Sequence, residues 1–259
     1  MTLLSNNVNT PITGSRVPPF HILGFTATLY ETTPDSLLVL SAGTCADSTD
    51  NIDMTIESTT TLNIATTGKN GLDTGAAGNN LFYYVYVIGD SSGFNAPAGL
   101  MSLSFTAPAL PYGYDSFRAV DIKVTDGTAD FLPSYTLGQY GPRKFVFDAP
   151  VLVLDGEGSA TFATVDLTET VAPVLTPMVQ FTVSITPETG EPGDAITLIP
   201  TDSASSAYAV FSGSVEDVAE VGDIECIAAV NSGAAEIDYK TTDVDDVASL
   251  WVKSFTYCV

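Results

Sequence analysis

The strongest pattern of apolar positions is a run of large side chains at residues 81–88, between loops rich in Gly, Asn, Asp and Ser. Its odd-numbered positions hold Leu, Tyr, Val and Val, and its even-numbered positions hold Phe, Tyr, Tyr and Ile. Successive side chains of a strand point to opposite faces, so both faces of this run carry large groups. The pattern therefore predicts a central strand that is covered front and back.

Shorter runs with the same alternation occur along the chain, each ended by a cluster of Gly, Pro, Asn or Asp. They are residues 26–30, 37–40, 52–57, 60–65, 101–106, 117–124, 144–148, 151–154, 161–167, 179–185, 196–200, 208–212, 224–229, 236–240 and 250–259. Many short strands at this spacing are typical of an antiparallel sandwich or barrel. We therefore predict an all-β fold, an antiparallel β-sandwich or jelly roll, with less than about a tenth of the residues in helix.

Helical spacing of apolar residues is scarce. Residues 213–223 and 243–251 each allow one or two helical turns. The final residues alternate again, which predicts a closing strand with Trp251, Phe255 and Tyr257 on one face.

Turn-rich segments suggest three parts. Residues 1–20 are rich in Asn, Thr, Ser and Pro and predict an extended arm. The mixture of turn residues in 135–142 places a boundary between a β-rich domain at 21–135 and a C-terminal β-sandwich at 136–259. The prolines in residues 172–177 mark a second candidate boundary. We expect the arm to anchor the protein to a neighbour.

Charge changes the picture of possible partners. The chain has 259 residues and a net charge of -23. Residues 1–144 hold six Lys and Arg against 12 Asp and Glu, whereas residues 145–259 hold two against 19. An acidic surface of this kind repels phosphate backbones, so we expect no nucleic-acid partner.

The cysteines and the N-terminus bear on location. Cys45, Cys226 and Cys258 show no C-x-x-C spacing, which suits assembly in a reducing cytoplasm, although a Cys226–Cys258 bridge stays open. The first residues lack the basic and apolar segments of a secretion signal, and no apolar run is long enough for a membrane span. We expect no membrane insertion.

Catalytic constellations are weak. His21 is the only histidine and has apolar neighbours, and no G-x-S-x-G segment is present. Clusters of acids, the kind of group that cleaves a glycan, lie in turns, where solvated acids are ordinary. They are Asp155 with Glu157, Glu216 with Asp217, and Asp243 with Asp245 and Asp246. We expect a protein that is not an enzyme and has no cofactor.

Two aspartate clusters have the spacing of oxygen ligands for calcium. Asp47, Asp50 and Asp53 are three residues apart, and residues 243–246 hold three aspartates. Neither cluster has the glycine-containing twelve-residue loop of a strong calcium signal. We therefore assign no metal site.

Aromatic residues in or beside loops suggest a binding surface. Tyr112, Tyr114, Tyr135 and Tyr140, with Phe117 nearby, offer flat rings of the kind that contact sugars. The four tyrosines are candidate contacts for a host glycan. Packing of the same rings between subunits or under loops is the alternative.

An ordered set of short segments covers roughly residues 40–185. It comprises residues 41–43, 47–49, 71–75 (GLDTG), 82–90 (FYYVYVIGD), 110–118 (LPYGYDSFR), 131–132 and 140–141. The set resembles structural virion proteins of tailed bacteriophages and prophages, of the tail-fibre or head-fibre kind.

The resemblance implies a protein located in the virion, exposed as a head fibre, decoration protein or tail-fibre component. It also implies a homotrimer that contacts other capsid or tail proteins through the arm, and a contribution to host attachment is a further expectation. The alternative from another class is a carbohydrate-binding or adhesive module without catalytic activity.

Overall fold

The computed structural model divides the chain into two compact units, residues 1–143 and 144–258. It describes residues 10–11, 21–138, 142–173, 177–187, 194–201, 209–213, 218–231 and 234–257. Across these segments the structure contains strands and turns but no helix, so the predicted all-β fold is confirmed. Accordingly, nothing in them is a helix long and apolar enough to cross a membrane. Except for residues 10–11, the expected arm lies outside the described segments.

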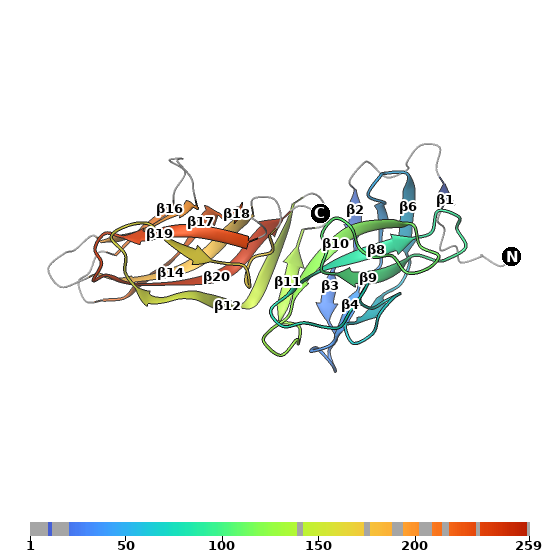
Figure 1. Ribbon diagram of the computed structural model, residues 1–259, viewed down its shortest axis with the longest axis horizontal. Coiled ribbons are helices and arrows are strands. Elements are labelled where there is room, and N and C mark those ends of the chain that lie inside the picture. The colour runs from blue at the N-terminus through green and yellow to red at the C-terminus, as the bar shows by residue number, and fades with distance from the viewer. Residues whose placement is uncertain are drawn as a thin grey trace. The chain divides into compact units, whose positions relative to one another are not determined.

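The described strands of the first unit, apart from β11, form three small sheets. The strands are β1 (Thr10–Pro11), β2 (Ile22–Gly24), β3 (Ala27–Leu29), β4 (Leu37–Leu40), β5 (Gly43–Ala46), β6 (Ile52–Ile56), β7 (Thr60–Asn63), β8 (Phe82–Gly89), β9 (Ala98–Ser102), β10 (Ser116–Val124) and β11 (Ser134–Leu137). The sheet orders are β1-β6-β5-β2, β3-β4-β7 and β10-β8-β9 (Figure 1).

β8 is the central strand of its sheet, and all of its residues are buried. The side chains at positions 83, 85 and 87 pack into the core of the unit, together with Leu40 and Met54. On the other face, Tyr86 meets Phe117 edge to face, with 5.8 Å between ring centroids. The predicted central strand with two covered faces is therefore confirmed.

β10 is interrupted by a β-bulge at Val120. Ala119 pairs with Tyr86 and Asp121 pairs with Val85, so Val120 has no partner residue on β8. The buried Arg143 donates a hydrogen bond from Nη1 to the carbonyl oxygen of Val120. A bulge disrupts the ladder locally, and here a guanidinium satisfies the bulged carbonyl.

The same guanidinium holds the corner between β2 and β3. Nη2 lies 3.0 Å from the carbonyl oxygen of Gly24, and Nη1 lies 3.1 Å from that of Phe25. Gly24 and Phe25 both have positive φ, 79° and 56°. A Cβ on Gly24 would lie 2.3 Å from the carbonyl oxygen of Ala42, so only glycine fits there.

The end of the first unit differs from the boundary expected after residue 135. β11 contacts β3, so it is part of the first unit. Arg143 is fixed by carbonyl groups of that unit, and the division falls directly after it. The turn-rich segment between β11 and Arg143 therefore precedes the division.

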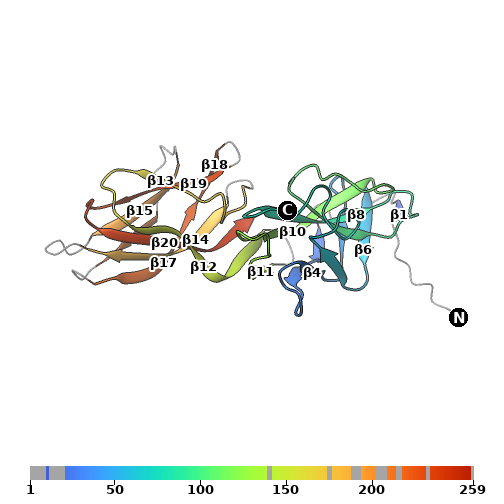
Figure 2. The same ribbon diagram turned by 60° about the horizontal axis from the view of Figure 1, so that its bottom comes forward.

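The second unit is a jelly roll. Its described strands are β12 (Arg143–Glu157), β13 (Ala163–Asp166), β14 (Met178–Thr186), β15 (Ala195–Pro200), β16 (Ala209–Ser212), β17 (Glu220–Ile227), β18 (Ala229–Asn231), β19 (Ala234–Thr241) and β20 (Val247–Tyr257). One sheet has the order β12-β20-β14-β17 and the other has the order β13-β19-β15-β16, with β18 beside β19 (Figure 2). Apart from β18, these described strands follow the order of two interlocked Greek keys.

The core of the jelly roll follows from alternation along its strands. In β19 every second residue is buried, and the inner positions of β14 alternate in the same way. The rings of Phe145 and Phe255 stack with 5.0 Å between centroids. Each sheet therefore presents one apolar face to the other and one polar face outward.

Some local expectations were wrong. The two strands expected at 144–148 and 151–154 are one strand, β12, which includes the exposed Pro150. The helical turns expected in 243–251 are also wrong, because Val247 begins β20. In 213–223, residues 214–217 are not described and β17 begins at Glu220.

The closing strand β20 is confirmed, but its faces differ from the expectation. Phe181 pairs with Val252 and Gln180 pairs with Ser254, so one extra residue interrupts the alternation. As a result Val252 and Phe255 are both buried, whereas Trp251 is only half-buried. Because of the bulge, Trp251 does not share a face with Phe255 and Tyr257, contrary to the expectation.

We predict that Arg143→Met destabilises the first unit. Each buried carbonyl left without a donor costs about 1–3 kcal/mol, so we expect a loss of about 3 kcal/mol in the free energy of unfolding. Urea unfolding with hydrogen exchange of β8 peptides measures the effect. Lys144→Met, which removes a single hydrogen bond to Gln180, is the control and should cost under about 1 kcal/mol. Equal losses in the two variants would contradict the role given to Arg143.

Candidate functional site

Two loops of the first unit lie against each other beyond the end of β8. They are residues 90–97, between β8 and β9, and residues 110–115, before β10, and we call them the loop tip. Asn95 Nδ2 donates to the carbonyl oxygen of Gly113 at 3.0 Å, and Tyr114 Oη donates to that of Ala96 at 3.1 Å. The amide of Ser91 donates to Asp115 Oδ1 at 2.9 Å. Side-chain bonds between the loops therefore fix the tip.

Asp90 organises the first of these loops. Its buried carboxylate accepts from the amide and hydroxyl of Ser92, at 2.9 and 2.6 Å. It also accepts from the amide and side-chain nitrogen of Asn95, both at 2.9 Å. The Ser92 hydroxyl, followed by the Asn95 amide, lowers the pKa of Asp90 to about 2.

Asp115 ties the second loop to the first. Partial burial acts to raise its pKa, but hydrogen bonds from Ser91 and Ser116 outweigh this effect and lower the pKa. The Ser91 hydroxyl and the Ser116 hydroxyl both donate to its carboxylate. Asp90 is thus held as an acceptor within its own loop, whereas Asp115 accepts from Ser91 of the first loop and from its neighbour Ser116.

Two aromatic rings are left bare by this arrangement. Phe94 is 90% exposed and Tyr112 is fully exposed. They flank the hydrogen bond between Asn95 and Gly113, because each is next in sequence to one of its partners. The polar groups beside them are engaged within the tip, so the surface offers aromatic area and few free hydrogen-bonding groups. Such a surface suits burial against a partner.

The predicted aromatic residues are not all brought together. Tyr112 lies on the loop tip and is exposed, whereas Tyr114 is half-buried and its hydroxyl is engaged. Tyr135 lies on β11, away from the two loops in sequence, and is 44% exposed. Tyr140 lies outside the described residues. Glycan contact by these residues stays a prediction.

Phe94 was missed by the sequence interpretation. It stands in the turn sequence SSGFN, after Gly93 with its positive φ of 74°. A large apolar residue in the middle of a polar turn has no strand on which to be buried. The place of Phe94 within a polar turn was therefore the sequence feature that could have predicted an exposed ring.

The first aspartate cluster has a structural role. Asp47 accepts from the amides of Asn51 and Ile52, at 2.6 and 3.0 Å, and from the Thr49 hydroxyl at 2.5 Å. Although burial acts to raise the pKa of Asp47, these hydrogen bonds outweigh it and the pKa is lowered. Asp50 is paired with Arg118 at 2.8 Å. Both carboxylates therefore serve the turn between β5 and β6.

The remaining candidates show no assembled centre. Asp246 is buried and accepts from the Asp243 amide at 3.0 Å, while Asp155 and Glu157 are exposed on β12. Glu216 and Asp217 lie outside the described residues, and His21 is half-buried. Within the described segments, no three His, Cys, Asp or Glu residues are grouped to hold a metal ion.

The cysteines of the described chain are buried and free. Burial raises the pKa of the Cys226 thiol to about 11 and raises that of Cys45 further. Thiols of this kind are poor nucleophiles because little thiolate forms at neutral pH. Cys258, the possible partner of Cys226, lies outside the described residues.

Comparison with known proteins assigns no family. No family model matches the chain, and no curated protein matches it. Among solved structures, the CBM22 xylan-binding domain from Paenibacillus barcinonensis is similar over 49% of this chain and 81% of its own, with 13% identity and a TM-score of 0.23. An exo-β-1,3-galactanase from Phanerochaete chrysosporium is similar over 90% of this chain and 57% of its own, with 11% identity and a TM-score of 0.24.

The VP2 subviral particle of infectious bursal disease virus is a third similar structure. It shares 11% identity over 96% of this chain and 75% of its own, with a TM-score of 0.28. The names of the three proteins describe different functions. Similarity at this level identifies neither a function nor a partner.

We predict that Asp90→Asn lowers the thermal midpoint of the first unit at neutral pH. The folded-state pKa is about 2, below the ordinary value of 3.8, so the carboxylate contributes stability above about pH 4. That contribution is lost as the pH falls through about 2. Thermal unfolding from pH 7 to pH 2 should show a gap between variant and wild type that narrows with acid.

The control is Glu57→Gln, which changes an exposed acid in the same unit. It should leave the midpoint nearly unchanged. A gap for Asp90→Asn that stays constant down to pH 2 would contradict the assignment of the effect to its carboxylate.

Proposed function

We propose that the protein is a structural component of a tailed-phage virion, exposed on the particle as a head fibre, decoration protein or tail-fibre component, and not an enzyme. The observation that carries the proposal is the loop tip, where a hydrogen-bonded loop pair presents Phe94 and Tyr112 to solvent. Exposed rings of this kind favour a role in assembly, because a partner that covers them removes a large apolar area from water.

The position of the segments that resemble phage proteins supports this proposal. The amide of Met101 on β9 donates to the Gly71 carbonyl at 2.8 Å, and the Asp73 amide donates to the Met101 carbonyl at 2.7 Å. Residues 71–75 therefore lie beside the sheet formed by β8, β9 and β10. Residues 82–90 and 110–118 supply β8, the second loop of the tip and the start of β10. These three segments of the resemblance thus lie in one packed region.

The partners that we propose are other copies of the chain and other virion proteins. A homotrimer would bury the rings of the loop tip, and the arm at residues 1–20 would anchor the protein to the capsid or tail. The acidic residues 145–259 would project into solvent, where salt screens repulsion between copies. Assembly would take place in the host cytoplasm.

The second candidate function is a carbohydrate-binding or adhesive module. The exposed Tyr112 favours it, since sugars stack on flat rings. The engaged state of Asp90, Asp115 and Ser91 weighs against the loop tip as the sugar site, because saccharides need free polar groups as well.

The double variant Phe94→Ser and Tyr112→Ser should fold normally and fail to assemble. Light scattering should give a mass of about three times 27.1 kDa for the wild type and one chain mass for the variant. The variant should also be lost from particles. Phe162→Ser, which removes a 45% exposed ring from the second unit, is the matched control and should assemble. A wild-type monomer at micromolar concentration would contradict the proposed trimer.

In intact virions, the exposed acids of the second unit should react with a carboxylate probe. We expect Asp155, Glu157 and Asp245 to be labelled to the same extent in particles and in free protein, because the acidic half faces solvent. Mass spectrometry of banded particles reads both the presence of the chain and its labelling. Absence of the chain would overturn the proposed function, whereas protection of these acids would overturn only the orientation.

A further inference from the structure

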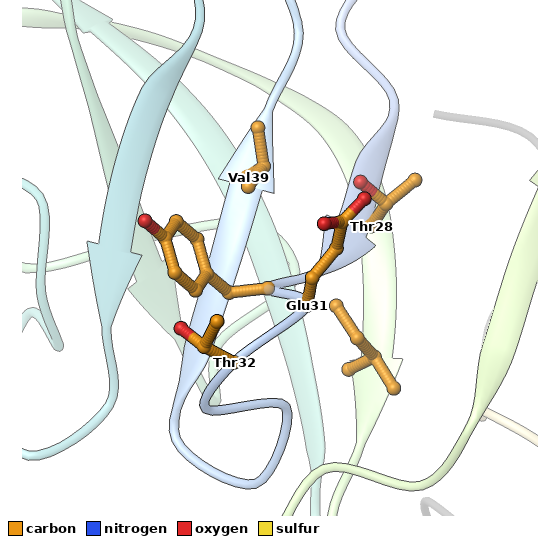
Figure 3. Close-up of a pocket in the computed structure, with 6 residues that line it drawn as sticks. Thr28, Glu31, Thr32 and Val39 are labelled. Atoms are coloured by element: carbon orange, nitrogen blue, oxygen red, sulfur yellow. The ribbon is translucent and has the colours of Figure 1, made fainter.

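A hollow of about 370 Å³ opens beside the β3–β4 hairpin of the first unit. Figure 3 shows it in close-up. It is lined by Thr28, Leu29, Tyr30, Glu31, Thr32 and Val39. The volume lies at the lower end of the range of about 300–1,000 Å³ that is common for small-molecule sites. No residue of the hollow belongs to the loop tip.

The backbone around the hollow is held in place. Thr28 pairs with Val39 in the β3–β4 ladder. Beyond the ladder, the Tyr30 amide donates to the Leu37 carbonyl at 3.0 Å. The turn is tied to the rest of the unit by the Phe131 amide, which donates to the Asp35 carbonyl at 3.0 Å. The site is therefore preformed, and ordering of the chain would subtract little from the free energy of ligand binding.

The polar side chains of the hollow are free. In the described part of the chain, four of them make no hydrogen bond to the protein: Thr28, Tyr30, Glu31 and Thr32. Glu31 extends its carboxylate toward Thr28, and Thr32 lies on the other side of the hollow (Figure 3). This arrangement contrasts with Asp90, whose carboxylate accepts four hydrogen bonds from its own loop.

We propose that this hollow binds a neutral saccharide. The Tyr30 ring, 36% exposed, can stack on the C–H face of a sugar, and Leu29 and Val39 add apolar contacts. The Glu31 carboxylate accepts from sugar hydroxyls in charge-assisted hydrogen bonds, and the threonine hydroxyls can donate or accept. The groups of the hollow thus have chemical counterparts on a sugar.

Charge restricts the kind of saccharide. Glu31 would repel a uronic acid, a sulfated sugar or a phosphate-bearing polymer, and the net charge of -23 adds to that repulsion at long range. A sugar without negative charge escapes both effects. The chemistry of the hollow does not depend on whether the chain belongs to a virion.

The test is binding of defined oligosaccharides to the purified full-length protein. The neutral probes are maltohexaose, cellohexaose, xylohexaose and chitohexaose, and oligogalacturonate is the acidic comparison. We expect at least one neutral probe to bind with chemical-shift changes at Thr28 and Tyr30. Glu31→Gln should weaken that binding about tenfold, in line with loss of a charge-assisted hydrogen bond. Tyr30→Ser should abolish it.

Two controls separate the hollow from other surfaces. Glu57→Gln removes an exposed acid outside the hollow, and Tyr112→Ser removes a ring of the loop tip. Both should bind the sugar as the wild type does, and all variants should keep the wild-type thermal midpoint because each site is exposed.

Three outcomes would overturn the proposal: no shift at Thr28 or Tyr30 with any neutral probe, binding of oligogalacturonate in preference, or binding of a lysine-rich peptide with no saccharide binding. The last outcome would assign the free carboxylate to a basic protein partner. None of the three bears on the presence of the chain in particles, which the labelling of virions tests separately.

Discussion

A buried guanidinium holds the first unit together. Arg143 donates to the carbonyl oxygens of Gly24, Phe25 and Val120, and so joins the β2–β3 corner to the bulge of β10. Asp121, one residue beyond the bulge, completes the attachment by accepting from the Ala27 amide at 2.6 Å. Backbone groups at a corner lie outside the sheet ladders and must find partners elsewhere. Here side chains supply them.

This constraint explains features that look unfavourable in isolation. Phe25 at positive φ costs about 1–3 kcal/mol of backbone strain, and a buried cation is costly to desolvate. Both costs are offset because the strained corner directs its carbonyl groups at the guanidinium, and the same guanidinium donates to the bulged carbonyl of Val120. The corner also sets the start of β3, and therefore the place of the hairpin that carries the hollow.

The sequence predicted the features that depend on side-chain period. β8 and the alternating strands of the jelly roll follow from apolar spacing, so the fold class could be derived. The face of Trp251 could not, because the bulge near Lys253 depends on how β14 and β20 pair. The division directly after Arg143 could not be predicted either, because it depends on the carbonyl partners of this residue. Two of them lie more than a hundred positions away in the sequence and the third lies 23 positions away. The engagement of the Tyr114 hydroxyl could not be predicted for a similar reason, because its partner comes from the other loop.

Acidic residues of the first unit divide into two kinds that composition cannot separate. Asp47 and Asp90 stand in polar turns and accept hydrogen bonds from their own loops, so they act as turn scaffolds. Glu31 stands in an equally polar turn, but there the backbone is closed by amide–carbonyl bonds and the carboxylate is left over. An acid that its own loop does not use remains available to a ligand. The hydrogen-bond partners of each carboxylate therefore distinguish the two surfaces. The aromatic loop tip, whose acids are engaged, suits a protein neighbour, and the polar hollow, whose acid is free, suits a sugar.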